Sequence, residues 1–240
     1  MDDLFINIIA SFIWLLIGLA ATNAWRRFQT RGQRQFWAPF LKGQGPISVV
    51  LTDKDGQYPR SPRKISITDV QAYSDVRSAL ESLGRIVELK ARTQADIGQL
   101  RRDCFVSLGG PLANGITEQV LLQLGSRLPV TFDATAKCFS YGGAQFCTAY
   151  DQSQRVERDY GLVVRLQKLN PNDLTSKPTL VVFGLHGHGT QQAVHAIVAN
   201  AEMGRKLKPY LSSDAFALLE FTFYDHKCTG SKVLHVDKLS

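Results

Sequence analysis

The sequence lacks the motifs that mark several common classes of protein. Its four cysteines (Cys104, Cys138, Cys147 and Cys228) form no CxxC pair, and its histidines and acids show no metal-ligand spacing, so we expect no metal site. It contains no GxSxG elbow and no P-loop, and we assign no catalytic residue from motifs. Without a helix-turn-helix, finger or RNP motif, the net charge of +7 does not predict a nucleic-acid partner.

Charge is absent from one long stretch, Leu4 to Ala24, near the amino terminus. About 20 apolar residues span a hydrocarbon core as a helix, and Trp25 stands where an interfacial anchor belongs. The alternative is a cleaved signal peptide, which requires a positive n-region and a short apolar core. Here Asp2 and Asp3 precede a long apolar run. We therefore predict a transmembrane helix over residues 1–25.

Acids are absent from residues 26–46, which we interpret as a basic juxtamembrane linker ending in a Gly/Pro stretch. Its basic residues are Arg26, Arg27, Arg31, Arg34 and Lys42. Lys and Arg near a span remain in the cytoplasm, and an anionic leaflet attracts them. We expect a single-pass protein of the inner (cytoplasmic) membrane, with its N-terminus outside and its C-terminal domain in the cytosol. The lipid bilayer is then the first expected partner.

Residues 47–240 suit one α/β domain. Short apolar strands alternate with helical segments, which favours a mostly parallel sheet with helices on both faces and hairpins at an edge. The expected strands are Ile47–Thr52, Arg85–Leu89, Cys104–Leu108, Tyr160–Leu166, Thr179–Leu185, Phe216–Phe223 and Lys232–Val236. The expected helices begin at a Thr68 cap, near residues 93 and 115, and at Thr190, and a polar loop covers residues 53–64.

A hairpin is predicted around Gly142-Gly143, a two-residue turn signal. Counting outwards from this turn pairs Tyr141 with Ala144 and ends with Cys138 opposite Cys147. These two thiols are close enough to bridge if oxidised. Because thiols in the cytosol are ordinarily reduced, we expect two packed free thiols instead.

Two glycine loops follow predicted strands and open predicted helices, so they form our candidate ligand site. In an open parallel sheet, ligands bind at the carboxyl ends of strands, and glycine lets the backbone approach a phosphate. The alternative interpretation is that the glycines only make tight turns. The candidate ligand-binding residues are Gly109, Gly110, Asn114, Thr117, His186, Gly187, His188, Gly189 and Thr190.

Three charged residues allow two interpretations each. Asp159 and Arg165 flank a strand and are candidates to reach a ligand, but the simpler interpretation has Asp159 ending a loop and Arg165 in an ion pair. Glu118 is a candidate catalytic acid, although a glutamate in the first turn usually complements the helix dipole.

The segment Gly187-His188-Gly189-Thr190 resembles the second motif of the SLOG superfamily, named for its Smf/DprA and LOG members. That motif reads proline-glycine-glycine-x-glycine-threonine-x-x-glutamate, and Gly109-Gly110 stands where the family has its first glycine motif. The resemblance implies a Rossmann-like fold that cleaves or binds nucleotides. This chain departs from the motif at Leu185 and His186, and Ala193 replaces the glutamate, which favours binding over N-glycosidic hydrolysis.

The resemblance also implies a function, because SLOG-like domains joined to transmembrane helices are proposed sensors of nucleotide signals in bacterial antiviral defence. We expect a membrane-anchored sensor that binds a nucleotide-derived ligand, needs no other cofactor and signals to a transmembrane helix. One helix forms no pore, so a channel-like output requires a homo-oligomer, with Gly18, Ala20 and Ala21 available for helix contacts. The alternatives are a membrane-tethered nucleotide or NAD hydrolase or transferase, and a non-catalytic membrane scaffold.

Overall fold

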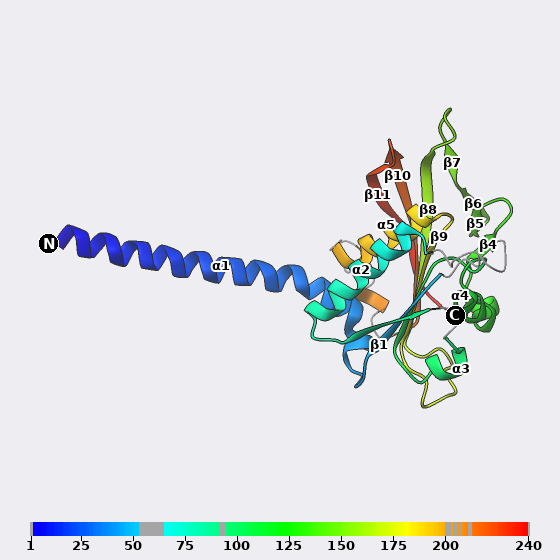
Figure 1. Cartoon of the computed structure of the whole chain (residues 1–240), viewed down its shortest axis with the longest axis horizontal. Coiled ribbons are helices and arrows are strands. Elements are labelled where there is room, and N and C mark those ends of the chain that lie inside the picture. The colour runs from blue at the N-terminus through cyan, green and yellow to red at the C-terminus, as the bar shows by residue number, and fades with distance from the viewer. Residues whose placement is uncertain are drawn as a thin grey trace.

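The computed structural model of the chain shows one long helix leading into an α/β domain (Figure 1). It describes residues 2–52, 65–91, 95–199, 203, 206, 208–210 and 213–239, without the side chains of residues 2–11, 23–31 and 208. The loop expected over residues 53–64 lies outside the described residues.

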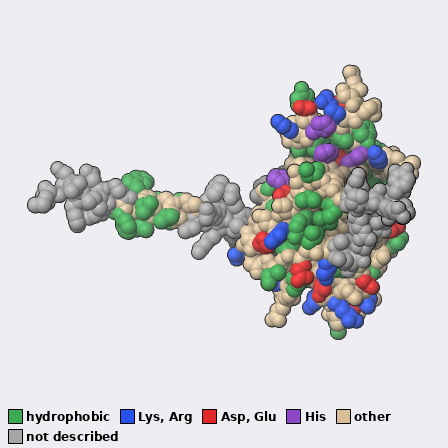
Figure 2. Space-filling model, viewed as in Figure 1, with side chains coloured by type: hydrophobic (Ala, Val, Ile, Leu, Met, Phe, Trp, Pro, Cys, Tyr) green, Lys and Arg blue, Asp and Glu red, His purple; other side chains and the backbone are tan. Residues whose placement is uncertain are grey.

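Helix α1 (Asp2–Leu41) is continuous over 40 residues and stands clear of the domain for most of its length (Figure 1). The described side chains of its first half are apolar and exposed, including Phe12 and Trp14 (Figure 2). Among the residues that the structure describes, no helix has both the length and the apolar character of a membrane span.

The last turns of α1 belong to the core of the domain. Phe36, Trp37 and Phe40 are fully buried. The ring of Trp37 contacts the other two edge to face, with centroid distances of 5.0 Å to Phe36 and 5.6 Å to Phe40. Residues 26–41, which the sequence suggested as part of a linker, are helical, and the core starts upstream of residue 47. Three aromatic side chains in five residues supply enough apolar area to hold a helix against a sheet.

The main sheet is mixed, and its strands run in the order β11-β10-β8-β9-β3-β1-β2, with β7 beside β8. The four strands β2, β1, β3 and β9 are parallel, and β8, β10 and β11 are antiparallel. The α/β class is therefore confirmed, but only half of the sheet is parallel. The strands are β1 (Ile47–Leu51), β2 (Val87–Ala91), β3 (Phe105–Leu108), β7 (Ala149–Tyr150), β8 (Val156–Leu166), β9 (Thr179–Gly184), β10 (Ala215–Tyr224) and β11 (Lys227–Lys238).

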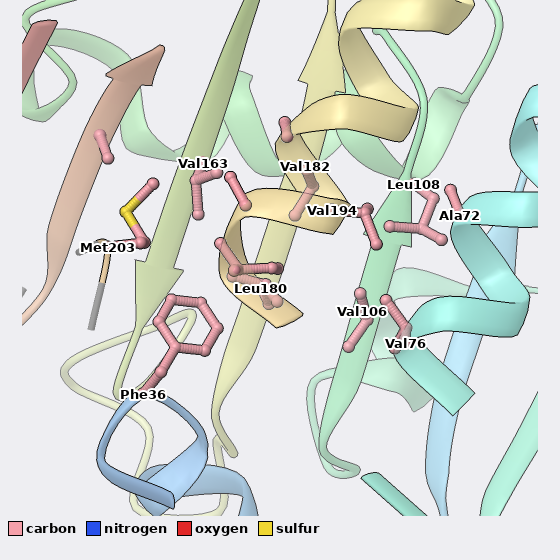
Figure 3. Packing of buried hydrophobic residues seen from close by; sticks show 14 of the residues in the cluster. Phe36, Ala72, Val76, Val106, Leu108, Val163, Leu180, Val182, Val194 and Met203 are labelled. Atoms are coloured by element: carbon pink, nitrogen blue, oxygen red, sulfur yellow. The ribbon is translucent and has the colours of Figure 1, made fainter. Parts of the chain in front are cut away.

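Helices cover both faces of this sheet. On one face α2 (Ile67–Ser82) and α5 (Gly187–Ala199) pack over β1, β3 and β9 beside Phe36 of α1 (Figure 3). On the other face lies α4 (Gly115–Leu124). Because both faces are covered, β1, β3 and β9 are buried at every residue, which is why they read as continuous apolar runs. The described residues also include three short helices: α3 (Ile97–Leu100), η2 (Gly125–Arg127) and η3 (Lys208–Tyr210).

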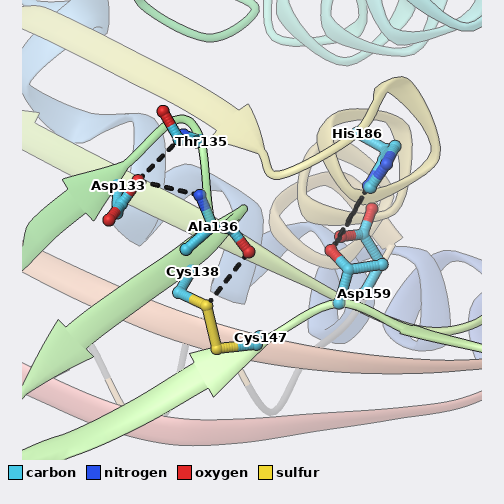
Figure 4. The surroundings of a disulfide bond; sticks show 8 residues. Asp133, Thr135, Ala136, Cys138, Cys147, Asp159 and His186 are labelled. Atoms are coloured by element: carbon cyan, nitrogen blue, oxygen red, sulfur yellow. Dashed lines mark hydrogen bonds and ion pairs between the residues drawn. A yellow bond between two sulfur atoms is a disulfide. The ribbon is translucent and has the colours of Figure 1, made fainter.

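A second, three-stranded sheet consists of β4 (Thr131–Asp133), β5 (Cys138–Tyr141) and β6 (Ala144–Cys147). The predicted hairpin register is confirmed, from Tyr141 opposite Ala144 to Cys138 opposite Cys147. The hairpin does not extend an edge of the main sheet, because Phe139 packs against Phe183 on the face that carries α4. Cys138 and Cys147 are joined by a disulfide (Figure 4), so the expectation of two free thiols is wrong.

Candidate functional site

The two glycine loops meet in one cavity of about 380 Å³ at the carboxyl ends of β1, β3 and β9. In the strand order β2-β1-β3-β9, chain connections leave β1 and β3 in opposite directions, and ligands of open α/β sheets bind at such a point. The cavity is lined by Thr52, Ser66, Asp69, Gly109, Gly110, Leu112, Ala113, Phe132, Gly184, Leu185, His186, Gly187 and Thr190. Its volume lies within the ordinary range for small-molecule sites.

The first loop brings Gly109 and Gly110 to the cavity for different reasons. Gly109 has φ +100°, and a Cβ there would collide with the Thr52 hydroxyl, so glycine is required by the turn itself. A Cβ on Gly110 would meet only ordinary contacts, with Phe183 at 3.7 Å and the carbonyl oxygen of Gly184 at 3.8 Å. Gly110 therefore faces the cavity without a packing reason to be glycine.

Asn114 and Thr117 do not reach the cavity, although the sequence made them candidate ligand-binding residues. Both side chains are fully buried. The Asn114 amide caps α4 by accepting from the backbone N–H of Ile116, and it donates to Ser107 Oγ and to the carbonyl of Leu108. Thr117 Oγ1 donates to the carbonyl of Gly109. These two residues hold the first loop against α4 from behind.

The second loop is shorter than the sequence suggested, because α5 begins at Gly187 and not at Thr190. A Cβ on Gly184 would collide with the backbone of Gly189, and a Cβ on Gly189 would lie 2.5 Å from Asp159 Oδ2. The Thr190 hydroxyl accepts from the N–H of Gly184 at 2.9 Å, so its role in the loop is internal. Gly184, Gly187 and Gly189 thus serve close packing, as the alternative interpretation held, while Gly187 and Thr190 also line the cavity.

His186 contacts four polar side chains at the cavity wall: Lys137, Thr148, Tyr150 and Asp159. Its Nδ1 lies 3.6 Å from Oδ1 of Asp159, which is fully buried (Figure 4). Its Nε2 lies 2.8 Å from the hydroxyl of Tyr150 and 3.0 Å from Nζ of Lys137. A carboxylate only accepts and an ammonium only donates, so we assign the proton of the neutral ring to Nδ1 and the lone pair to Nε2.

Asp159 anchors this arrangement from beneath. Its Oδ2 accepts the N–H of Gly189 at 2.8 Å, and its Oδ1 accepts from Thr148 Oγ1 at 3.3 Å. Because this carboxylate of β8 lies against the first turn of α5, it also complements the helix dipole. Asp159 therefore does more than end a loop, because it fixes both the second glycine loop and the imidazole.

The remaining candidates lie elsewhere. The ring of His188 contacts Phe223 and His226, away from the cavity lining. Glu118 is exposed in the first turn of α4, as a residue that complements the dipole would be. The nearby Ser66 caps α2, two residues before the Thr68 cap that the sequence predicted.

Arg165 lies apart from the cavity and holds α1. Its side chain is fully buried, and it donates to the carbonyls of Phe36 at 3.4 Å and Tyr210 at 2.5 Å. Within the described residues these carbonyls replace the predicted ion pair. Burial lowers the pKa of Arg165 to about 10, and the charge of Asp214 only partly opposes this shift.

Another cavity, of about 450 Å³, lies between α5 and β11 and is lined by residues such as Gln192, His195 and Cys228. We favour the cavity at the glycine loops because it lies at the carboxyl edge of the sheet, where the backbone of both loops and the imidazole of His186 line the same space. In the described part of the chain, no group of three His, Cys, Asp or Glu residues is placed to hold a metal ion.

Sequence reasoning missed Lys137, Thr148 and Tyr150, which all contact His186. They belong to the hairpin region, about 40 residues upstream, and the pairing of β7 with β8 and the packing of Phe139 on Phe183 bring that region to the second glycine loop. Comparison of the chain with protein-family models, with curated proteins and with solved structures found no match.

Proposed function

We propose that this chain is a membrane-anchored sensor whose α/β domain binds a nucleotide-derived ligand in the cavity between the glycine loops. The observation that carries the proposal is that two loops 75 residues apart, chosen from sequence, open on the same cavity at the carboxyl edge of the sheet. The SLOG-like motif at Gly187–Thr190 supports a nucleotide as the ligand class. The absence of the motif's glutamate, at Ala193, supports binding in preference to hydrolysis.

The polar groups of the wall suggest how such a ligand would be oriented. The Asp69 carboxylate at one side would accept hydrogen bonds from ribose hydroxyls or a base amine. Beside His186, the ammonium of Lys137 would attract a phosphate. Leu112, Ala113 and Phe132 provide apolar wall for a base.

The anchor is proposed from the uncharged run and from the exposure of apolar side chains on α1. Phe12, Ile13 and Trp14 are 60, 50 and 72% exposed, and exposed apolar surface of this kind marks a membrane or protein contact. The basic residues that follow favour the cytosol for the domain. After alkaline washing of membranes we expect the chain in the pellet, and its release into the supernatant would contradict the anchor.

Signal output is proposed to pass from α5 to α1. The first turn of α5 lines the cavity, and near its other end the carbonyl of Val198 accepts from the side-chain amide of Gln33 on α1. Arg165 holds α1 by the carbonyl of Phe36. A ligand that repositions α5 would then bias how α1 helices associate into an oligomer.

The test is a thermal-shift screen of the full chain in detergent with linear nucleotides, cyclic nucleotides and NAD derivatives. A ligand specific for the folded state stabilises it by roughly 2.7 kcal/mol at a hundredfold excess over Kd. The variant Gly110→Trp fills the cavity from a position that tolerates a side chain, and it should abolish the shift. Leu122→Trp, at an exposed position on α4, is the matched control. No shift with any compound would overturn the proposal and favour the scaffold.

One observation favours the enzymatic alternative, a nucleotide or NAD hydrolase or transferase. A buried carboxylate that orients an imidazole at the wall of a cavity is the arrangement a general base requires. This alternative predicts turnover of a nucleotide or NAD that His186→Gln abolishes. The absence of any product after prolonged incubation would remove it.

A further inference from the structure

The disulfide lies next to the residues that contact His186. Lys137 directly precedes Cys138, and Thr148 directly follows Cys147. The N–H of Thr148 donates to the carbonyl of Lys137 at 3.2 Å, which closes the open end of the hairpin just beyond the disulfide. The bond therefore joins the two chain segments that carry these side chains.

Both segments contact the wall of the cavity through the same ring. Lys137 Nζ lies 3.0 Å from Nε2 of His186, and Thr148 Oγ1 lies 3.3 Å from its Nδ1 and 3.3 Å from Asp159 Oδ1. Asp159 in turn accepts the N–H of Gly189. A continuous set of contacts thus leads from the disulfide to the second glycine loop. Figure 4 shows its two ends, the disulfide and the pair of His186 and Asp159.

The hairpin is fixed to the core by Phe139, whose ring packs against Phe183, but two of the side chains beyond its open end are exposed. Lys137 and Tyr150 are exposed, and Lys137 has φ +51°, a left-handed conformation that is uncommon for a lysine. Cys138 is buried but Cys147 is half-buried, which gives a thiolate a path to one sulfur. Cys104 and Cys228 are free.

We propose that the Cys138–Cys147 disulfide is a redox control on the cavity. In the oxidised state the bond holds Lys137 and Thr148 on His186, so the second glycine loop is fixed and an ammonium stands at the cavity wall. An external dithiol attacks the sulfur of Cys147, and two electrons and two protons pass to the pair. Two thiols form, and the dithiol leaves as its own disulfide. The freed segments then release His186.

This inference rests on the proposed ligand cavity, and it explains a disulfide in a domain proposed to face the cytosol. Disulfides in that compartment are typically transient and redox-sensing. Reduction would weaken ligand binding by removing Lys137 and by loosening the loop at Gly187–Gly189.

The experiment measures backbone amide exchange in the full chain, without ligand, in oxidised and reduced states. Thiol counting under denaturing conditions comes first, and we expect two free thiols before reduction and four after. Reduction should then raise the exchange rate of the Leu185 and Gly189 amides by about tenfold or more, while the central amides of β9 keep their protection.

Two variants identify the cause. In Cys138→Ala/Cys147→Ala the loop should exchange at the reduced rate and show no response to the dithiol. In Lys137→Met/Thr148→Val the disulfide stays intact, and the loop should nevertheless exchange fast. Cys104→Ser is the control and should behave as the unaltered chain.

Two outcomes would overturn the proposal: four free thiols in protein prepared without reductant, or a reduced hairpin with unchanged exchange at Leu185 and Gly189. Neither depends on finding a ligand. A failed nucleotide screen with a redox-sensitive loop would refute the proposed function alone.

Discussion

Replacing Trp37 with alanine tests whether α1 ends in the core or in a linker. Trp37 is 0% exposed and packs between Phe36 and Phe40. Truncation of a buried tryptophan costs about 3–5 kcal/mol, and its aromatic contacts add about 0.5–1.5 kcal/mol each. The indole N–H is buried without a partner in the described structure. Removing it therefore offsets the loss of stability by about 1–3 kcal/mol, the cost of burying an unpaired donor. We expect a net loss of about 3–4 kcal/mol.

The measurement is scanning calorimetry in detergent. For a domain of this size 1 kcal/mol corresponds to roughly 2–4 °C, so the Tm should fall by about 6–16 °C. Trp14→Ala is the matched control, since Trp14 is 72% exposed on the same helix and should leave the domain's Tm unchanged. Equal Tm values for the two variants would refute the placement of α1 in the core and restore the linker interpretation.

Two further changes test buried polar groups. Asn114→Ala should lower the free energy of unfolding by about 1–3 kcal/mol, because it removes a helix cap and one hydrogen bond each to Ser107 Oγ and to the carbonyl of Leu108, which keep a threonine hydroxyl as partner. Urea denaturation measures this loss against Gln119→Ala, an exposed site on α4. Arg165→Met should leave stability unchanged or raise it at pH 7. Folding lowers the pKa of Arg165 to about 10. Burying the charged side chain therefore reduces the free energy of unfolding at every pH below that value, and this cost is lost as the pH rises through it. A loss above about 3 kcal/mol in denaturation at pH 7 would show that its hydrogen bonds to α1 outweigh desolvation.

The parts of the fold that depend on local pattern could be predicted from the sequence. Strands β1, β3 and β9 are short apolar runs because both faces of each are covered. The hairpin register follows from the two-residue turn at Gly142-Gly143 alone. In the same way, a glycine loop after a buried strand predicts the edge of the sheet where the cavity lies.

The parts that depend on tertiary contacts could not be predicted. The basic composition of residues 26–46 predicts a juxtamembrane linker, whereas residues up to Leu41 are helical because the domain covers Phe36 and its neighbours. The sequence predicts a ligand contact at Asn114, but a helix cap and a binding residue share the same position after a loop, and the structure shows the cap. The local sequence around Lys137 does not predict a role at the cavity, because its partner His186 is 49 residues away in sequence.

The continuity of α1 has a mechanical consequence for the assembled protein. From the end of the uncharged run at Ala24 to Phe36 the helix rises about 18 Å, at 1.5 Å per residue, with no break in its backbone. With the proposed anchor, this continuous helix would hold the domain away from the bilayer without a flexible joint. If two such helices associate in the bilayer, their contact faces would fix the rotation of each domain about its helix axis. Contacts within the membrane would therefore determine the distance between the two cavities and the direction in which they face.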